Sequence, residues 1–151
     1  MTSARKYAEF LESVSPQTLE DFDQFLGEDV FFSDPFHQVR GIELFKGVFS
    51  EMFMKVGPVR FEVSRVFQAD REAVLIWEFS ALLMNRPWVV PGTSRIVFDQ
   101  NGKVIEHIDY WDSGRYFLMH LPVIGRFVSW LYRRVGHDSV QKGRQLDWPY
   151  A

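Results

Sequence analysis

The sequence predicts an α+β domain in which helices come first and a curved antiparallel sheet follows. Up to Gly57-Pro58, apolar residues recur at helical spacing, whereas after it they alternate with polar residues or form long runs. The 151 residues include 15 Phe, 5 Trp and 5 Tyr, which indicates a core with a large volume to line. We therefore expect the N-terminal helices to pack on the concave face of the sheet, forming a cone-shaped domain with an interior.

Periodicity locates the elements of the first part of the chain. We expect a helix at 4–14, a helix at 18–27, a strand at 30–33 and a helix at 42–54. Tyr7, Leu11 and Val14 form one apolar stripe of the first helix, and Thr18 can cap the second. The apolar residues of the third helix include Phe53.

The second part reads as strands. They are expected at 59–64, 73–84, 88–98 and 103–111. The run from Ala73 to Met84 is apolar on both faces, with Trp77 at its middle, and so predicts a strand covered on both sides. Pro91-Gly92 predicts a bulge or a bend, and Asn101-Gly102 predicts a two-residue hairpin turn.

That turn would place pocket-forming residues together. It sets three pairs opposite one another on one face that also carries Trp111: Ser94 with Asp109, Ile96 with His107, and Phe98 with Ile105. This face mixes apolar walls with a serine, a histidine and an acid, as ligand pockets do. Arg95 and Glu106 are predicted to lie near each other on the opposite face.

Asp34 lies between an apolar strand and a proline turn, so its carboxylate is expected to look into the interior. A weakly solvated carboxylate can accept a proton near neutral pH. The competing interpretation is that Asp34 only caps the turn. His37, three residues on, can orient Asp34, shuttle a proton or lie on the surface. His107 can pair with Asp34 or Asp109, or be a buried structural histidine.

Composition narrows the function classes. The absence of cysteine excludes disulfides and thiol chemistry. No His-Glu-x-x-His pattern or glycine-rich phosphate loop occurs, so we expect neither a metal nor a cofactor. No signal-peptide core or membrane-length apolar run is found, and we expect a cytoplasmic protein.

Charge separates the chain into two parts. Residues 113–151 carry six basic and two acidic residues, a net charge of +4, which leaves −7 on residues 1–112. An acidic body argues against binding to nucleic acid. The segment after Pro122 reads as a basic amphipathic helix. We expect it to pack over the cone or a second subunit; a lid over the pocket and contact with a membrane surface are the alternatives.

The chain resembles the nuclear transport factor 2-like superfamily, and within it the SnoaL-like and ketosteroid isomerase-like proteins. The resemblance covers roughly residues 4–112, with 113–151 as a helical extension of the same domain. The motifs that carry it are Tyr7, Phe32-Ser33-Asp34-Pro35, the hairpin residues 98–104 and the stretch 106–112.

The resemblance implies roles for individual residues. Asp34 falls at the position of the proton-transferring aspartate, and Tyr7 can fall at that of the oxyanion-binding tyrosine. The position of the protonated aspartate that assists this tyrosine holds Ser94 instead, which departs from the steroid isomerase pattern. SnoaL-like cyclases use an acid on the closing strand, so Asp109 is a second candidate acid or base, with His37 and His107 as further catalytic candidates.

The implied function is a cofactor-independent isomerase or cyclase that acts on a small, largely apolar carbonyl or polycyclic compound. The side chains expected to contact the ligand are Ser94, Trp77, Trp111, Ile96, Phe98 and Phe53. A homodimer through the sheet is also expected. An epoxide hydrolase or dehydratase is an alternative, but the epoxide chemistry needs an arginine between two acids, and Arg95 is predicted on the other face. A binding or dimerisation module without catalysis is the third possibility.

Overall fold

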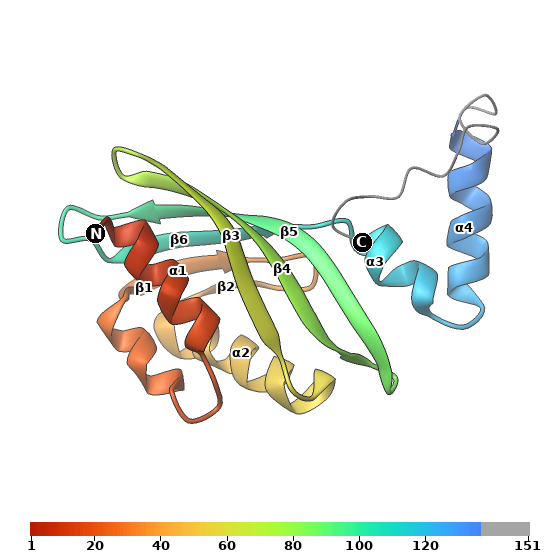
Figure 1. Ribbon diagram of the computed structural model, residues 1–151, viewed down its shortest axis with the longest axis horizontal. Coiled ribbons are helices and arrows are strands. Elements are labelled where there is room, and N and C mark those ends of the chain that lie inside the picture. Colours follow the sequence, from red (N-terminus) through yellow and green to blue (C-terminus); the bar gives the residue numbers. More distant parts are fainter. Residues whose placement is uncertain (137–151) are drawn as a thin grey trace. The chain divides into compact units, whose positions relative to one another are not determined.

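The structure, a computed structural model, describes residues 1–136 (Figure 1). The chain forms two compact units, Met1–Trp111 and Asp112–Ala151. In the first unit the elements are α1 (Ser3–Ser13), the 3-10 helix η1 (Leu19–Gln24), β1 (Leu26–Ser33), β2 (Gln38–Arg40), α2 (Ile42–Val56), β3 (Arg60–Ala69), β4 (Glu72–Leu83), β5 (Arg86–Phe98) and β6 (Val104–Tyr110). The sheet has six strands in the order β2-β1-β6-β5-β4-β3.

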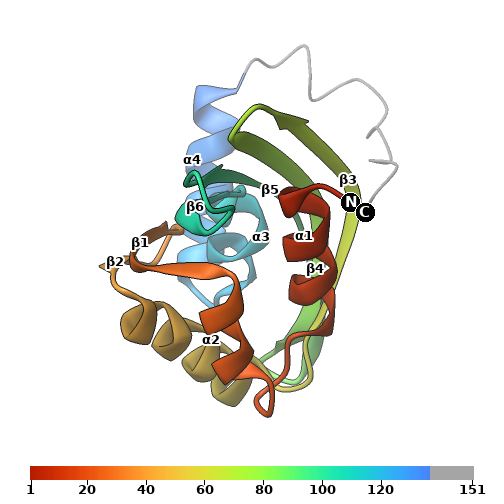
Figure 2. The same cartoon turned by 90° about the vertical axis from the view of Figure 1, so that its left-hand side faces the viewer.

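The α+β architecture is as predicted, with α1 and α2 on the concave side of a curved sheet (Figures 1 and 2). Helix α1 begins after Thr2, whose hydroxyl accepts a hydrogen bond from the Arg5 N–H. The helix is fastened to β3, because the Glu12 carboxylate accepts a hydrogen bond of 2.8 Å from the Val63 N–H. This attachment holds Tyr7, on the buried face of α1, over the inner face of the sheet.

Aromatic rings fill much of the interior. Phe22 and Phe45 are fully buried, and their ring centroids lie 5.0 Å apart in an edge-to-face arrangement. Phe32 on β1 packs against Phe45 at the same centroid distance. The many aromatic residues noted in the sequence therefore serve mainly as core packing between α2, η1 and the sheet.

A buried lysine joins α2 to η1. The ammonium of Lys46 lies 2.7 Å from a carboxylate oxygen of Asp23 and 2.8 Å from one of Glu20, while the side chain is only 7% exposed. Hydrogen bonds to Asp23 and Glu20 raise the pKa of Lys46, which therefore stays charged. The ion pairs thus replace the water that the buried ammonium loses.

Strands β3 to β6 are antiparallel as predicted, but the whole six-stranded sheet is mixed. Strands β1 and β6 pair in parallel, with Phe32 opposite His107 and Ser33 opposite Ile108. The antiparallel meander from β3 to β6 brings β6 back beside β1 in the same direction. Parallel strands end at the same edge, so the residues that follow Ser33 and Ile108 lie near each other.

Two local predictions also need correction. The predicted helix at 18–27 is a short 3-10 helix, after which Leu26 already belongs to β1. The predicted bulge at Pro91-Gly92 is absent, since β5 continues through it with Trp77 opposite Gly92. The pairing with β6 ends at Thr93, so Pro91 has only β4 as a neighbour, a position where a strand tolerates proline.

The last hairpin keeps most of the predicted register. Its loop is longer than two residues, and the Asp99 carboxylate accepts hydrogen bonds from the N–H groups of Asn101 and Lys103, both at 2.8 Å. An irregularity after Val97 places Phe98 opposite Val104, which leaves Ile105 exposed rather than on the inner face as predicted. Beyond it, Ser94 faces Asp109 and Ile96 faces His107, as predicted.

The second unit is helical over its described residues. It contains α3 (Ser113–Tyr116), the 3-10 helix η2 (Leu118–His120) and α4 (Ile124–Val135). The Asp112 carboxylate caps α3 by accepting a hydrogen bond of 2.9 Å from the Arg115 N–H. The helix predicted after Pro122 is therefore present. Within residues 1–136, no helix is both long and apolar enough to cross a membrane.

Replacement of Gly92 by alanine is expected to destabilise the domain. A Cβ atom at this position would lie 2.3 Å from the indole ring of Trp77, so the ring or the strand must move. Such overpacking costs typically about 1–3 kcal/mol. Urea unfolding of Gly92→Ala would measure the loss.

Gly47→Ala is the matched control. No atom lies within 4 Å of a Cβ at this position in α2, so the same change should stabilise the helix by about 0.5–1 kcal/mol. Equal effects at both positions would show that contact with Trp77 does not explain the glycine in β5.

Candidate functional site

Five side chains form a continuous hydrogen-bonded series on the inner face of the sheet, called here the polar chain. The Trp77 indole N–H donates to the Ser94 hydroxyl at 2.8 Å, and this hydroxyl donates to Oδ1 of Asp109 at 2.5 Å. His107 Nε2 lies 2.8 Å from the same Oδ1. Its other ring nitrogen, Nδ1, lies 2.8 Å from the Tyr7 hydroxyl. The polar chain thus links β4, β5, β6 and α1.

Only the middle group of this series, Asp109, reaches the surface. Tyr7 and Ser94 are fully buried and His107 is 2% exposed, whereas the side chain of Asp109 is 20% exposed. Buried polar groups are costly unless they are hydrogen-bonded. Among the described residues, no buried side-chain nitrogen or oxygen lacks a partner. The polar chain is therefore satisfied inside the core, and it presents a single carboxylate outward.

The protons along the polar chain can be assigned from these contacts. Burial, and then the negative charge of Asp109, raise the pKa of Tyr7 well above its ordinary value, so the hydroxyl keeps its proton. A protonated hydroxyl donates to His107 Nδ1, which leaves the ring hydrogen on Nε2, where it can be donated to Asp109. Oδ1 of Asp109 then accepts two hydrogen bonds, from His107 and from Ser94.

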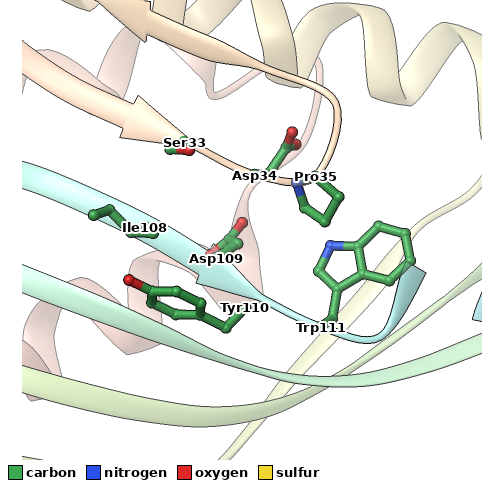
Figure 3. Close-up of a pocket in the computed structure, with 7 residues that line it drawn as sticks. All are labelled: Ser33, Asp34, Pro35, Ile108, Asp109, Tyr110 and Trp111. Carbon is green, nitrogen blue, oxygen red and sulfur yellow. The ribbon is translucent and has the colours of Figure 1, made fainter. Parts of the chain in front are cut away.

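A shallow, open cavity of about 540 Å³ lies where β1 and β6 end (Figure 3). Its lining combines two acids with apolar and aromatic side chains: Ser33, Asp34, Pro35, Ile108, Asp109, Tyr110 and Trp111. Asp109 therefore belongs both to the polar chain and to the cavity wall. Two carboxylates from strands distant in the sequence meet in one cavity because β1 and β6 are parallel.

The carboxylate of Asp34 is already engaged in its own turn. Oδ1 accepts hydrogen bonds of 2.7 Å from the N–H groups of both Phe36 and His37. The His37 ring nitrogen Nδ1 lies 3.0 Å from the same oxygen. Asp34 thus does cap the turn, although it also lines the cavity. His37 orients Asp34 and is about one-third exposed.

The structure separates the remaining predicted site residues into two groups. Trp111 lines the cavity, and its ring packs edge-to-face with that of Phe36 at 5.5 Å. Ile96 and Phe98 are buried in the core, Phe53 is half-buried on α2, and none of the three lines this cavity. Contact of these three residues with a ligand remains a prediction.

Four lining residues were not expected from the sequence: Ser33, Pro35, Ile108 and Tyr110. Ser33 and Pro35 flank Asp34 in the sequence, so the Asp-Pro motif is the signal from which their place in the lining could be predicted. Ile108 and Tyr110 alternate with Asp109 along β6, so strict alternation predicts them on the opposite face of the strand. They join the lining because the cavity lies at the end of the strand, where residues of both faces border the same opening.

Arg95 lies away from this cavity. Its guanidinium forms ion pairs with the carboxylates of Glu72 and Glu106. The proximity of Arg95 to Glu106 agrees with the predicted register of the last hairpin. These acids raise the pKa of Arg95, foremost through the hydrogen bond to Glu72. The arginine between two acids that epoxide opening needs is therefore not found among the lining residues.

No group of His, Cys, Asp and Glu side chains within residues 1–136 is arranged to hold a metal ion. The chemistry that the cavity itself offers is proton transfer by carboxylates, together with hydrogen bonds from the hydroxyls of Ser33 and Tyr110 and the indole N–H of Trp111.

Comparison with solved structures places the fold among known proteins. An NTF2-like protein of unknown function from Exiguobacterium aligns over 74% of this chain and 98% of its own, with a TM-score of 0.63 and 12% identity. An LEH-like epoxide hydrolase from M. tuberculosis aligns over 76% and 86%, with a TM-score of 0.64 and 17% identity. A protein from Catenulispora acidiphila with a ketosteroid isomerase-like fold, solved with trimethylamine, aligns over 77% and 91%, with a TM-score of 0.66 and 11% identity.

At these identities the solved structures establish the fold alone. No curated protein matches the chain in sequence. A model of the SnoaL-like domain matches residues 7–107, which includes Tyr7, Asp34, Ser94 and His107 and stops just before Asp109. Because this match covers most of the chain and agrees with the fold, the protein belongs to the SnoaL-like domain family.

Proposed function

We propose that the protein catalyses proton transfer on a small, largely apolar carbonyl or polycyclic compound, with Asp109 as the general acid and base. One observation carries this proposal: Asp109 is the member of the buried polar chain that also lines the cavity. A carboxylate held in one orientation beside an apolar binding surface can move a proton between two carbons of an apolar compound.

The proposed step uses the two oxygens of Asp109 differently. In the described residues, both hydrogen bonds to this carboxylate end on Oδ1, which leaves Oδ2 for the cavity. Oδ2 would take a proton from the carbon next to a carbonyl, and the electron pair of the broken C–H bond would form the enolate. Return of the same proton to another carbon completes an isomerisation. In a cyclisation, the enolate carbon would form a bond to the carbon of a second carbonyl group, and Asp109 would return the proton to the oxygen of that group.

His107 and Tyr7 support this step as positioning residues. The imidazole, held by the Tyr7 hydroxyl at one nitrogen, fixes the Asp109 carboxylate through the other. Because Tyr7 is fully buried and bonded to His107, it is a poor candidate for binding the enolate oxygen directly. Donors on the cavity lining are better placed for that role, above all the indole N–H of Trp111, which faces Asp109 in Figure 3.

A binding or dimerisation module without catalysis is the second candidate. It is favoured by Asp34, whose carboxylate is occupied by its own turn and by His37. It is also favoured by the outer face of the sheet, where Val74 and Ile76 are each more than a third exposed. A homodimer through this face would cover both side chains.

Asp109→Asn is expected to lower the rate of proton transfer by about 10²–10⁴-fold, because the amide keeps the shape of the side chain but cannot accept the proton. The measurement follows the absorbance that appears when an unconjugated cyclic enone becomes conjugated. Asp34→Asn should reduce the rate much less, since Asp34 is held as a turn cap.

Binding of the saturated ketone to both variants, followed by the fluorescence of the cavity tryptophan, separates catalysis from affinity. Asp109→Asn should bind the ketone about as well as the wild type does. If the wild type binds the ketone but none of the proteins converts the enone, the binding-module alternative replaces the proposal. If Asp34→Asn lowers the rate of enone conversion more than Asp109→Asn does, Asp34 is the general base instead of Asp109.

The burial of Tyr7 predicts how stability depends on alkaline pH. An unfolded chain releases a tyrosine proton near pH 10, whereas folded Tyr7 retains it because its pKa is raised. Above about pH 10 the unfolded state therefore binds fewer protons, and the free energy of unfolding falls as the pH rises. Below that pH the contribution of Tyr7 is fully present.

Urea unfolding at pH values on both sides of 10 measures this slope. Tyr7→Phe should flatten it and should also lower stability at neutral pH by about 1–3 kcal/mol, because His107 Nδ1 loses its buried partner. Tyr110→Phe, at a more than half-exposed position, is the control and should leave the alkaline slope unchanged. If Tyr7→Phe retains the full slope, Tyr7 is not the group that makes stability fall at alkaline pH.

A further inference from the structure

Helix α4 carries an exposed apolar face that the SnoaL-like domain does not account for. Ile124, Phe127, Leu131 and Val135 recur at helical spacing and form what is called here the apolar stripe. Their exposed fractions are 50%, 60%, 41% and 81%. Four large apolar side chains in solvent on one short helix indicate a binding surface.

The apolar stripe is not the side of α4 that packs within its own unit. That side contains Gly125, where a Cβ would lie 2.3 Å from the Met119 carbonyl oxygen, and Tyr132, whose hydroxyl would lie 1.9 Å from a Cβ at Gly114. Helical geometry places Gly125 about a quarter of a turn or more from the stripe residues. The short-range packing of α4 on η2 and α3 therefore leaves the stripe uncovered by these two elements.

The helix lies outside the residues that the family model matches. The family match ends at residue 107, and α4 begins at Ile124. The Exiguobacterium structure is covered over 98% of its length by 74% of this chain. The SnoaL-like fold is therefore complete without α4. We infer that the apolar stripe serves to bind something other than this fold.

We propose that α4 binds the surface of a membrane that contains anionic lipids. Its charged residues are Arg126, Arg133 and Arg134, and the helix has no acid. Trp130 borders the apolar stripe, and the Arg134 guanidinium lies 5.9 Å from the Trp130 ring centroid. Such a helix lies in the plane of a bilayer, with its apolar side chains among the acyl chains, an aromatic ring at the interface and arginines near the phosphates.

Its length excludes a membrane span. The 12 residues of α4 extend about 18 Å, whereas the hydrocarbon core of a bilayer is about 30 Å thick. The residues before the helix extend its apolar surface, since Val123 is 80% exposed. Binding in the plane of the membrane is therefore the mode that the dimensions allow.

The charges of α4 favour lipid over the two protein partners considered from the sequence. A second copy of the helix, packed stripe to stripe, would cover the apolar side chains but would offer no acid of α4 to any of the arginines. The acidic residues 1–112 would attract the arginines. However, Arg126 lies on the side opposite the apolar stripe, so one protein surface cannot satisfy both faces. At a bilayer interface, the acyl chains can contact the apolar stripe while the anionic headgroups contact the arginines.

Sedimentation of the full chain with lipid vesicles tests this proposal. The probes are vesicles of phosphatidylcholine alone and of phosphatidylcholine mixed with phosphatidylserine. The wild type should partition more strongly into the anionic vesicles. Phe127→Gln should weaken that partitioning by about tenfold or more, since the ring no longer leaves water. Arg126→Gln and Arg134→Gln should each weaken it by about fivefold, in anionic vesicles only.

Matched control variants lie on the sheet of the first unit. Phe67→Gln removes an aromatic ring of similar exposure, 57%, and Arg65→Gln removes an exposed positive charge. Both should sediment with vesicles as the wild type does. Wild type that fails to bind anionic vesicles at low salt, or a loss equal in the control variants, overturns the proposal. If Phe127→Gln instead converts a dimer to a monomer in analytical ultracentrifugation without vesicle binding, the partner is a second copy.

Discussion

The imidazole of His107, on β6, is buried between Tyr7 of α1 and Asp109 near the end of β6, and a buried imidazole needs a partner at both nitrogens. The Tyr7 hydroxyl supplies one partner and the Asp109 carboxylate the other. This requirement couples the placement of α1 to the orientation of Asp109. The hydrogen bond from the Val63 N–H to Glu12, near the end of α1, holds the helix on β3 and so contributes to the same arrangement. The packing of α1 in the core therefore also determines the geometry of the candidate site.

The parallel pairing of β1 and β6 determines where that site opens. Had the two strands run antiparallel, Asp34 and Asp109 would lie at opposite edges of the sheet. In the parallel arrangement both chains leave the sheet at the same edge, and two carboxylates line one cavity. Their environments differ, because Asp34 is bound by its own turn while Asp109 is held by buried side chains. This difference is the reason to give them different roles.

The second unit adds a separate physical property to the chain. The first unit packs its aromatic residues inside, whereas α4 keeps Phe127 and Leu131 in solvent. Such exposure is costly in water and becomes favourable only when another apolar surface is present. A SnoaL-like domain that carries out its chemistry at a membrane surface would meet apolar compounds where they concentrate. The proposed lipid contact and the proposed substrate class are thus compatible, although each is tested independently.

The sequence by itself determined the order of helices and strands, the register that sets Ser94 opposite Asp109, and the amphipathic helix after Pro122. These features depend on local periodicity, which the chain carries residue by residue. It also pointed to Asp34 and Asp109 as candidate acids. Only the tertiary structure decided that β1 runs parallel to β6, that Trp77 covers Gly92, and that Tyr7 bonds to His107. Each of these contacts joins residues from different elements, and its geometry depends on how whole elements pack, which no local pattern encodes.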